Sequence, residues 1–336
     1  MGEAGFVFLE LDPFERRIHH IDFAADMRWE YCLVDVNWDT RIGYEKMKEL
    51  VDYAARKNVK LILWYNSAGG WNTTPYHPRN MLLTRDGRRK EFQRIKDMGV
   101  AGVKIDFFAG DGQSMIRYYI DILEDAADIG LLINFHGATL PRGWQRTYPH
   151  LMTAEAIKGQ EMVTFSQDFA NEQPAHVVTA VYTRNLFDPM DYTPMTLDSI
   201  PRIHRVTTKT FELASTVLFL SGIQHLAESP MGMAKQSAEI KDFLRTLPRY
   251  WDETRFLAGE PGKSVLIARR SGNKWYVGGM NGEQDLKPLD VDLSFMGSGY
   301  YFEDTSRTES VKKVYSGGGK ITLPAYGGFV GVFEVK

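Results

Sequence analysis

Residues 102–107 read GVKIDF, a nearly continuous apolar run that ends at an aspartate and a phenylalanine. Such a run is typical of a strand that is buried on both faces of a parallel sheet. Runs of the same kind occur at 31–36, 60–66, 131–136, 151–156 and 224–228. Helix-period stretches alternate with them, at about 42–57, 86–98, 112–128, 174–186, 204–220 and 235–247. The alternation of strand and helix predicts a parallel sheet.

Two weaker strand candidates, 6–11 and 190–193, bring the total to eight, the number in a (β/α)8 or TIM barrel. After Asp252 the pattern changes to short β-rich runs and Gly-rich turns without helical periodicity. These runs lie at 264–269, 274–279, 289–293, 300–303, 320–323 and 329–335. We therefore expect a (β/α)8 barrel over residues 1–254 and a small antiparallel β sandwich over residues 255–336.

The composition of the 336 residues is ordinary, with a net charge of −3. Nucleic acid and anionic membrane surfaces favour basic partners, so we expect neither. The single cysteine, Cys32, lies in an apolar run and is interpreted as a buried hydrophobe. The N-terminus is too acidic and its apolar stretch too short for a signal peptide, and no run has the length of a membrane span. The cellular location and the oligomeric state stay open.

Polar and aromatic side chains follow the predicted strands, where the active sites of barrel enzymes lie. The candidates are Asp35, Trp38, Trp64, Asn66, Lys104, Asp106, His136, Glu155 and Glu161. The alternative is that these are ordinary polar groups at strand ends and, for the tryptophans, core residues. Aromatic side chains at such positions also stack on the apolar faces of sugars.

Lys104 and Asp106 are two residues apart, so both point to the same side of their strand. A lysine keeps a neighbouring carboxylate ionised, as a nucleophile requires, although a structural ion pair has the same pattern. Glu155 and Glu161 could hold a hard cation such as Ca²⁺, and one of them could be a general acid. Glu161 could equally be a solvated loop residue, and His136 either binds a sugar hydroxyl or is buried.

Motifs for dinucleotide binding, nucleotide phosphates, nucleophilic serine and zinc proteolysis are missing from the sequence. What remains is carboxylate chemistry on a barrel rich in aromatic residues, which indicates an enzyme acting on glycosides.

At these residues the chain resembles glycoside hydrolase family 97. The segments that carry the resemblance are WEYCLVDVNW (29–38), KLILWYNSAGGW (60–71), GVAGVKIDFF (99–108), INFHGATLPRGWQRTYPHLMTAEAIKGQE (133–161), PMDYTPM (189–195), HLAESP (225–230), LPRYWDET (247–254) and SVLIARRSGNKWYVGGM (264–280). The resemblance implies exo-acting hydrolysis of α-glycosides, with a calcium ion near the active site. Inverting members of the family carry a glutamate base directly after the histidine of the fifth strand, where this chain has Gly137. Retaining members, which are similar to α-galactosidases, carry a nucleophilic aspartate in a K-x-D segment, which corresponds to Asp106.

The resemblance thus implies a retaining exo-glycosidase for α-galactosides, with an oligosaccharide or polysaccharide as substrate. Asp106 would be the nucleophile and Glu161 the acid/base, with their carboxyl groups about 5–6 Å apart. Glu155 and Glu161 would bind calcium. Lys104 and His136 would bind substrate, together with Asp35, Trp38, Trp64 and Asn66.

Three other functions stay open. They are hydrolysis of β-L-arabinopyranosides by the same mechanism, an inverting α-glucosidase, and a carbohydrate-binding protein without catalysis. The chain also departs from the family at its start, because GEAGFVFLELD replaces the usual first strand and we expect the family's large N-terminal β-sandwich domain to be absent. That domain supplies a calcium ligand in the family, so calcium binding is the expectation that depends most on the presence of this domain.

Overall fold

The computed structural model describes residues 13–315 and 317–336. They form two compact units, divided between Ala156 and Ile157. Among the described residues, no helix is both long enough and apolar enough to cross a membrane.

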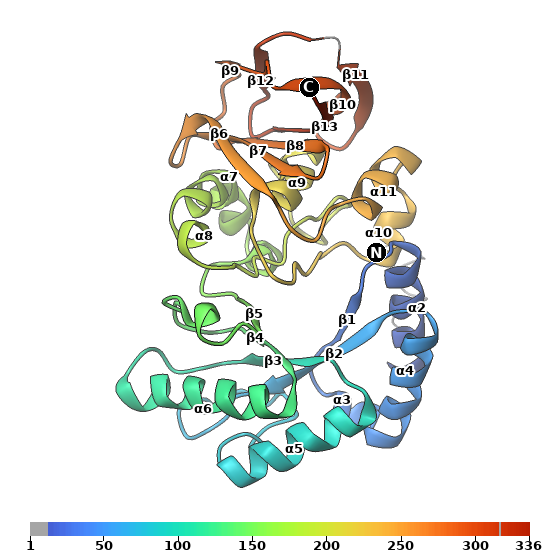
Figure 1. Cartoon of the computed structure of the whole chain (residues 1–336), viewed down its shortest axis with the longest axis vertical. Helices are drawn as coiled ribbons and strands as arrows, with labels where there is room; N and C mark the ends of the chain where they lie inside the picture. The colour runs from blue at the N-terminus through green and yellow to red at the C-terminus, as the bar shows by residue number, and fades with distance from the viewer. Residues whose placement is uncertain (1–12, 316) are drawn as a thin grey trace. The chain divides into compact units, whose positions relative to one another are not determined.

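The first unit is built on a five-stranded parallel sheet with the order β1-β2-β3-β4-β5. Figure 1 shows α4, α5 and α6 running alongside this sheet. The strands are β1 (Tyr31–Val34), β2 (Lys60–Asn66), β3 (Gly102–Asp106), β4 (Leu132–Phe135) and β5 (Leu151–Ala154). The helices are α2 (Pro13–Asp26), α3 (Trp38–Arg41), α4 (Tyr44–Arg56), α5 (Arg85–Met98), α6 (Gln113–Ile129) and the 3-10 helix η1 (Trp144–Arg146).

The sequence sets the bounds of α5 and α6 by recognisable signals. The Thr84 hydroxyl accepts a hydrogen bond from Gly87 N at 3.2 Å and caps the start of α5. Gly99 (φ +96°) ends α5 and Gly130 (φ +83°) ends α6, both in the left-handed region that glycine adopts without strain. Because β3 begins at Gly102 and β4 at Leu132, these two glycines fix where the central strands start.

The second unit combines helices with antiparallel strands. Its helices are η2 (Gln160–Thr164), α7 (Gln167–Tyr182), α8 (Arg184–Phe187), α9 (Lys209–Leu218), α10 (Pro230–Ala234) and α11 (Ala238–Arg245). Its strands are β6 (Glu253–Glu260), β7 (Ser264–Ser271), β8 (Lys274–Asn281), β9 (Lys287–Asp290), β10 (Met296–Asp304), β11 (Ser310–Tyr315), β12 (Lys320–Leu323) and β13 (Gly328–Val335). They form a six-stranded sheet, β11-β10-β13-β8-β7-β6, and a two-stranded sheet, β12-β9.

The six-stranded sheet is covered on both faces by apolar side chains. Residues of α7 and α9, such as Val178 and Phe211, share one core cluster with Val265 and Met280 of the sheet. The other face packs against the strand pair β9 and β12, through a cluster that includes Leu266 and Leu323. All ten residues of α9 are buried. Helices α7 and α9 and one face of the six-stranded sheet therefore share one hydrophobic core.

The structure confirms the predicted class, a TIM-barrel-like α/β core followed by antiparallel sheets, and corrects several elements. The segments 190–193 and 224–228 form no strand, although both belong to the described residues. The strand predicted at 6–11 lies outside the described residues. Sequence patterns missed α2 and the edge strands β6 and β11, which expose much of their length and so lack a continuous apolar run. The predicted domain boundary at residue 254 lies at the start of β6 and stays a prediction. The compact units divide after Ala156, and α7 and α9 pack on the C-terminal sheet.

Candidate functional site

Asp106 is the last residue of β3, and its partner across the sheet is Asn66, the last residue of β2. The carboxylate is half-buried. Its Oδ1 accepts a hydrogen bond from Phe107 N at 2.7 Å, and its Oδ2 accepts one from Trp64 Nε1 at 3.3 Å. Each oxygen therefore has a donor from the first unit, and the carboxylate is fixed in orientation before any ligand binds.

The backbone next to Asp106 is held in an unusual turn. Phe107 has φ +68°, a left-handed conformation that is costly for a residue with a large side chain. Its carbonyl oxygen accepts hydrogen bonds from Asn72 Nδ2 at 3.1 Å and from Trp71 Nε1 at 3.3 Å. The loop after β2 thus stabilises the turn that directs the Asp106 side chain.

Gly137 follows β4 and lies against this turn. It has φ +48°, and a Cβ added there would lie 2.8 Å from Asp106 Oδ1 and 2.8 Å from Phe107 N. Contacts that short do not occur for real Cβ atoms, so any larger residue must displace either the carboxylate or the backbone beside it. The position after His136 is therefore closed to a side chain by Asp106 itself.

Three other predicted residues belong to the same strand ends. Lys104 is two residues before Asp106 on β3 and is 8% exposed, while His136 is 3% exposed. Glu155 follows β5, and its Oε2 accepts a hydrogen bond from Gly137 N at 2.8 Å. The same oxygen lies 3.6 Å from His136 Nδ1. The structure thus brings Glu155, His136 and Gly137 together at the end of β4.

The predicted calcium site has no complete set of ligands among the described residues. No group of three or more His, Cys, Asp or Glu side chains there is placed to hold a metal ion. Glu155 has one oxygen engaged by a backbone N–H, as described above. A calcium ion needs 6–8 oxygen ligands. Calcium binding by Glu155 and Glu161 therefore stays a prediction.

Trp38 and Asn66 have internal roles in the first unit. Trp38 is 1% exposed, donates its Nε1 hydrogen to Trp64 O at 2.8 Å and packs edge-on against Tyr44 and Tyr65. Asn66 is fully buried, donates to Tyr76 O at 3.1 Å and accepts from Ala68 N at 3.0 Å. Their polar atoms hold the protein together, and a substrate contact for either residue stays a prediction.

Asp35 and Trp64 complete the predicted set in this unit. Asp35 is partly buried, and its Oδ1 accepts a hydrogen bond from Val36 N at 2.9 Å. Trp64 is 1% exposed, and its ring meets that of Phe107 edge to face at 5.9 Å. Trp64 Nε1 holds the Asp106 carboxylate. A substrate contact for Asp35 or Trp64 stays a prediction.

Glu161 belongs to the second unit, where it is the second residue of η2. Its side chain is exposed, and its carbonyl oxygen accepts a hydrogen bond from Thr164 Oγ1 at 2.6 Å. The preceding residue, Gln160, is 3% exposed. An exposed carboxylate next to a buried anchor is available to a ligand, which is a requirement for an acid/base.

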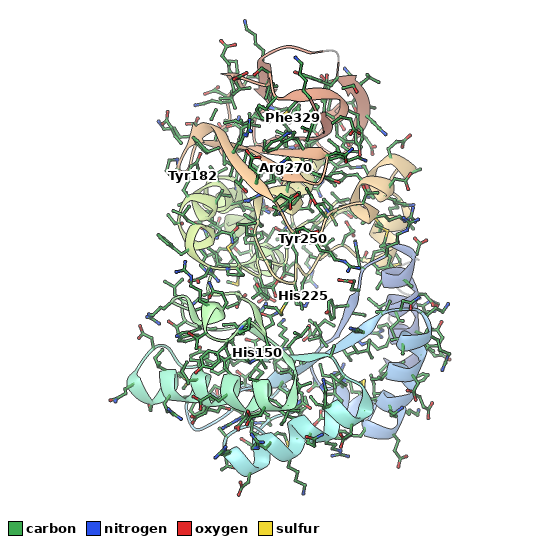
Figure 2. All side chains as sticks on the ribbon, viewed as in Figure 1. His150, Tyr182, His225, Tyr250, Arg270 and Phe329 are labelled. Carbon is green, nitrogen blue, oxygen red and sulfur yellow. The ribbon has the colours of Figure 1, made fainter. Side chains whose placement is uncertain are left out.

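The segments 190–193 and 225–230, expected to be strands or their ends, contain polar contacts that sequence reasoning missed. His225 Nδ1 lies 2.8 Å from Asp191 Oδ2, and Asp191 is 1% exposed; Figure 2 labels His225. Glu228 Oε2 accepts hydrogen bonds from Leu197 N at 2.6 Å and Asp198 N at 2.9 Å. Both segments, PMDYTPM and HLAESP, belong to the family resemblance, and this resemblance is the sequence signal that indicates these candidates.

Comparison with known proteins gives matches along most of the chain. Residues 13–157 match the profile of the family described as Glycoside hydrolase 97. Residues 250–333 match the profile described as Glycosyl-hydrolase 97 C-terminal, oligomerisation. The two matches fall in the first unit and in the β-rich part of the second.

Two curated relatives are named as α-galactosidases. A "Probable retaining alpha-galactosidase" of Streptomyces bingchenggensis is 36% identical over 272 residues, which are 77% of this chain and 39% of that protein. A "Retaining alpha-galactosidase" of Bacteroides thetaiotaomicron is 31% identical over 299 residues, 84% of this chain and 43% of that protein. The chain thus spans about two fifths of the length of these relatives.

Two solved structures share the fold over nearly the whole chain. The crystal structure of a β-arabinopyranosidase has a TM-score of 0.91 and 37% identity, covering 95% of this chain and 53% of that one. A Glycoside Hydrolase Family 97 enzyme in complex with acarbose, from Pseudoalteromonas sp., has a TM-score of 0.74, covering 96% of this chain and 56% of that one. At 22% identity the second likeness shows the fold alone.

Proposed function

We propose, since this chain belongs to glycoside hydrolase family 97, that it is a retaining, exo-acting glycoside hydrolase that removes terminal α-galactosyl groups. The observation that carries the proposal is the packing of Gly137 against the Asp106 carboxylate. The family resemblance places the base of inverting members at the position of Gly137, and no side chain fits there while Asp106 keeps its place.

The proposed reaction is a double displacement at the anomeric carbon. Asp106 attacks that carbon while Glu161 protonates the leaving oxygen, and a covalent glycosyl-enzyme forms. Glu161 then accepts a proton from water as the water attacks the same carbon and releases Asp106. The hydrogen bonds from Trp64 Nε1 and Phe107 N orient the carboxylate for the first attack, because they hold both oxygens. Lys104 and His136 are proposed to bind sugar hydroxyls.

The main alternative for the sugar is β-L-arabinopyranose. Its ring has the stereochemistry of α-galactose without the hydroxymethyl group, so the same carboxylates would serve both. The curated relatives are named for α-galactoside hydrolysis, whereas the structure at 37% identity is that of a β-arabinopyranosidase. The contacts of the hydroxymethyl group decide between the two substrates, and the relatives support both.

A panel of nitrophenyl glycosides tests the function. Nitrophenyl α-galactoside, β-L-arabinopyranoside and α-glucoside are incubated with the chain, and ¹H NMR follows the anomer released first. We expect turnover of the first or second substrate with retention of configuration. Release of the inverted anomer would contradict the retaining assignment, and hydrolysis of the glucoside alone would contradict the galactoside assignment. Sugar binding without turnover would favour the carbohydrate-binding alternative.

The same panel with and without a chelator tests calcium. Because the described carboxylates do not form a set of calcium ligands, we record thermal stability alongside activity. A drop in both with chelator, and recovery with added Ca²⁺, would support the calcium prediction. Unchanged activity and unchanged stability would show that this chain works without the ion.

A further inference from the structure

Glu212 is a buried carboxylate of the second unit. It lies on α9 and is 2% exposed. Its Oε1 accepts hydrogen bonds from Thr207 Oγ1 at 2.7 Å and from Gln173 Nε2 at 3.3 Å. Its Oε2 accepts hydrogen bonds from Thr196 N at 3.1 Å and from Gln160 Nε2 at 3.3 Å. One carboxylate therefore joins segments that are as far apart in sequence as residues 160 and 212.

One of these segments carries Glu161. Gln160 donates its side-chain amide to Glu212, and its own Oε1 accepts a hydrogen bond from Gln173 Nε2 at 2.8 Å. The Gln160 backbone N–H donates to Tyr192 O at 2.9 Å. Gln160 is thus held at both its side chain and its backbone. Glu161 is the next residue in the chain, so the contacts of Gln160 also restrict the backbone position of Glu161.

The helix η2 needs such support because it is short. It has five residues, and Gly159 at its N-cap gives no side-chain hydrogen bond. A 3-10 helix of this length has little stability of its own, so contacts from elsewhere decide its place. Besides Gln160, Val163 anchors η2 in a small apolar cluster with Ala170 and Ile200.

The charge of Glu212 is costly to bury. Burial raises the pKa of the Glu212 carboxyl. The charge of Arg205 and the hydrogen bonds donated to Glu212 oppose that shift. A buried carboxylate with four donors gives no packing advantage over an apolar side chain of similar volume, and such networks serve to hold one arrangement. One of the four donors to Glu212, Gln160, lies on η2.

We propose that Glu212 is a positioning residue for Glu161, which it places through the side chain of Gln160. The proposal rests on the proposed function, in which Glu161 is the acid/base. It implies that loss of the Glu212–Gln160 contact impairs proton donation to the leaving group while leaving the attack by Asp106 intact.

The test compares two leaving groups on the sugar that the panel identifies. A dinitrophenyl glycoside needs little protonation to leave, whereas a methyl glycoside needs full protonation. For Glu212→Gln and for Gln160→Leu, we expect kcat/KM on the methyl glycoside to fall at least tenfold more than on the dinitrophenyl glycoside. Glu212→Gln keeps the shape of the side chain, and Gln160→Leu keeps the buried volume while removing the donor, so one variant remains informative if the other fails to fold.

Asp304→Asn is the matched control. Asp304 is a partly buried carboxylate of this unit, and desolvation raises its pKa as well. It accepts hydrogen bonds from Thr210 N and Thr210 Oγ1, on the same helix as Glu212, and η2 is not among its partners. We expect this variant to lose activity equally on both substrates, in proportion to the folded fraction.

Two outcomes separate the proposals. Equal losses on both substrates in Glu212→Gln and Gln160→Leu would overturn the positioning role while the function stands. A wild-type chain that hydrolyses neither substrate would remove the proposed function, and the role of Glu212 with it.

Discussion

The two units hold their proposed catalytic carboxylates in different ways. Asp106 ends a central strand, and its immediate partners, Trp64 and Phe107, lie on the neighbouring strand and at the next position in the chain. Glu161 lies on a five-residue helix whose anchor, Gln160, depends on Glu212, more than fifty residues later. Strand pairing thus fixes the first carboxylate, and a buried polar network fixes the segment that carries the second. We therefore expect the position of Asp106 to respond to changes at the strand ends around it. The position of Glu161 should respond to changes in the buried network around Glu212.

Removal of Asp106 gives the largest effect. Asp106→Gly deletes the atom that attacks the anomeric carbon, so hydrolysis falls by several orders of magnitude. Azide can enter the space beside an intact Glu161, and with an activated aryl α-galactoside the product is the β-galactosyl azide, from one displacement. NMR of the product identifies the anomer. Near-normal activity of this variant would mean that Lys104 and Asp106 form only a structural pair.

Removal of Glu161 comes second and depends on the leaving group. Glu161→Ala lowers kcat/KM for substrates with poor leaving groups by about 10²–10⁴-fold, the usual contribution of a positioned acid. An activated aryl substrate still forms the glycosyl-enzyme, and azide then yields the α-azide through two displacements. The opposite anomers from the two variants distinguish the roles. If Glu161→Ala gave the β-azide, the two assignments would have to be exchanged.

Gly137→Ala tests the strand-end side of the comparison. Its Cβ would meet Asp106 Oδ1 at 2.8 Å, and a displaced nucleophile costs about 10²-fold in kcat. The control is Gly143→Ala, where φ is +80° and nothing lies within 4 Å of the added atom. Both variants bear a backbone strain of about 1–2 kcal/mol. The midpoint temperature of thermal unfolding should therefore fall in both variants, whereas kcat should fall only in Gly137→Ala. A similar kcat loss in both would assign the effect to strain alone.

The smallest effect concerns the pH dependence of stability in the second unit. Burial raises the pKa of Glu212, so the folded chain binds its proton more tightly than the unfolded chain does. Its contribution to the free energy of unfolding therefore decreases as pH rises from the unfolded pKa, near 4.5, through the raised folded pKa. Relative to wild type, Glu212→Gln should gain stability over this range. Urea unfolding at several pH values measures it, and a constant difference would contradict the raised pKa.

The sequence predicted the first region well because its signals are local. Continuous apolar runs predict β1 to β5, and Lys104, Asp106, His136 and Glu155 lie at or near the ends of these strands, as expected. The sequence shows that a glycine follows His136. Only the structure shows that Asp106, at the end of β3, leaves no room there for a larger side chain.

The second region was predicted less well because its contacts are distant in sequence. Glu212 occurs in a helix-period stretch and has no local feature that distinguishes it from a solvated glutamate. The segments 190–193 and 224–228 contain apolar residues, but their polar side chains cap loops and pair with each other instead of extending a sheet. Trp38 is a substrate candidate by residue type alone, and the structure adds that its indole N–H donates to Trp64 O within the core.

The complete burial of α9 has a consequence for how such chains can be recombined. One flank of this helix lies against β8 and β13, where Gly278 and Gly328 leave room for it, and its Glu212 supports η2. Exchanging the C-terminal strands for those of another protein at residue 254 would replace the surface on which α9 lies. Because Glu212 lies on α9 and contacts Gln160, the exchange would also disturb the position of Gln160. A junction after Ala156 keeps α9, its sheet and η2 as a single inherited module.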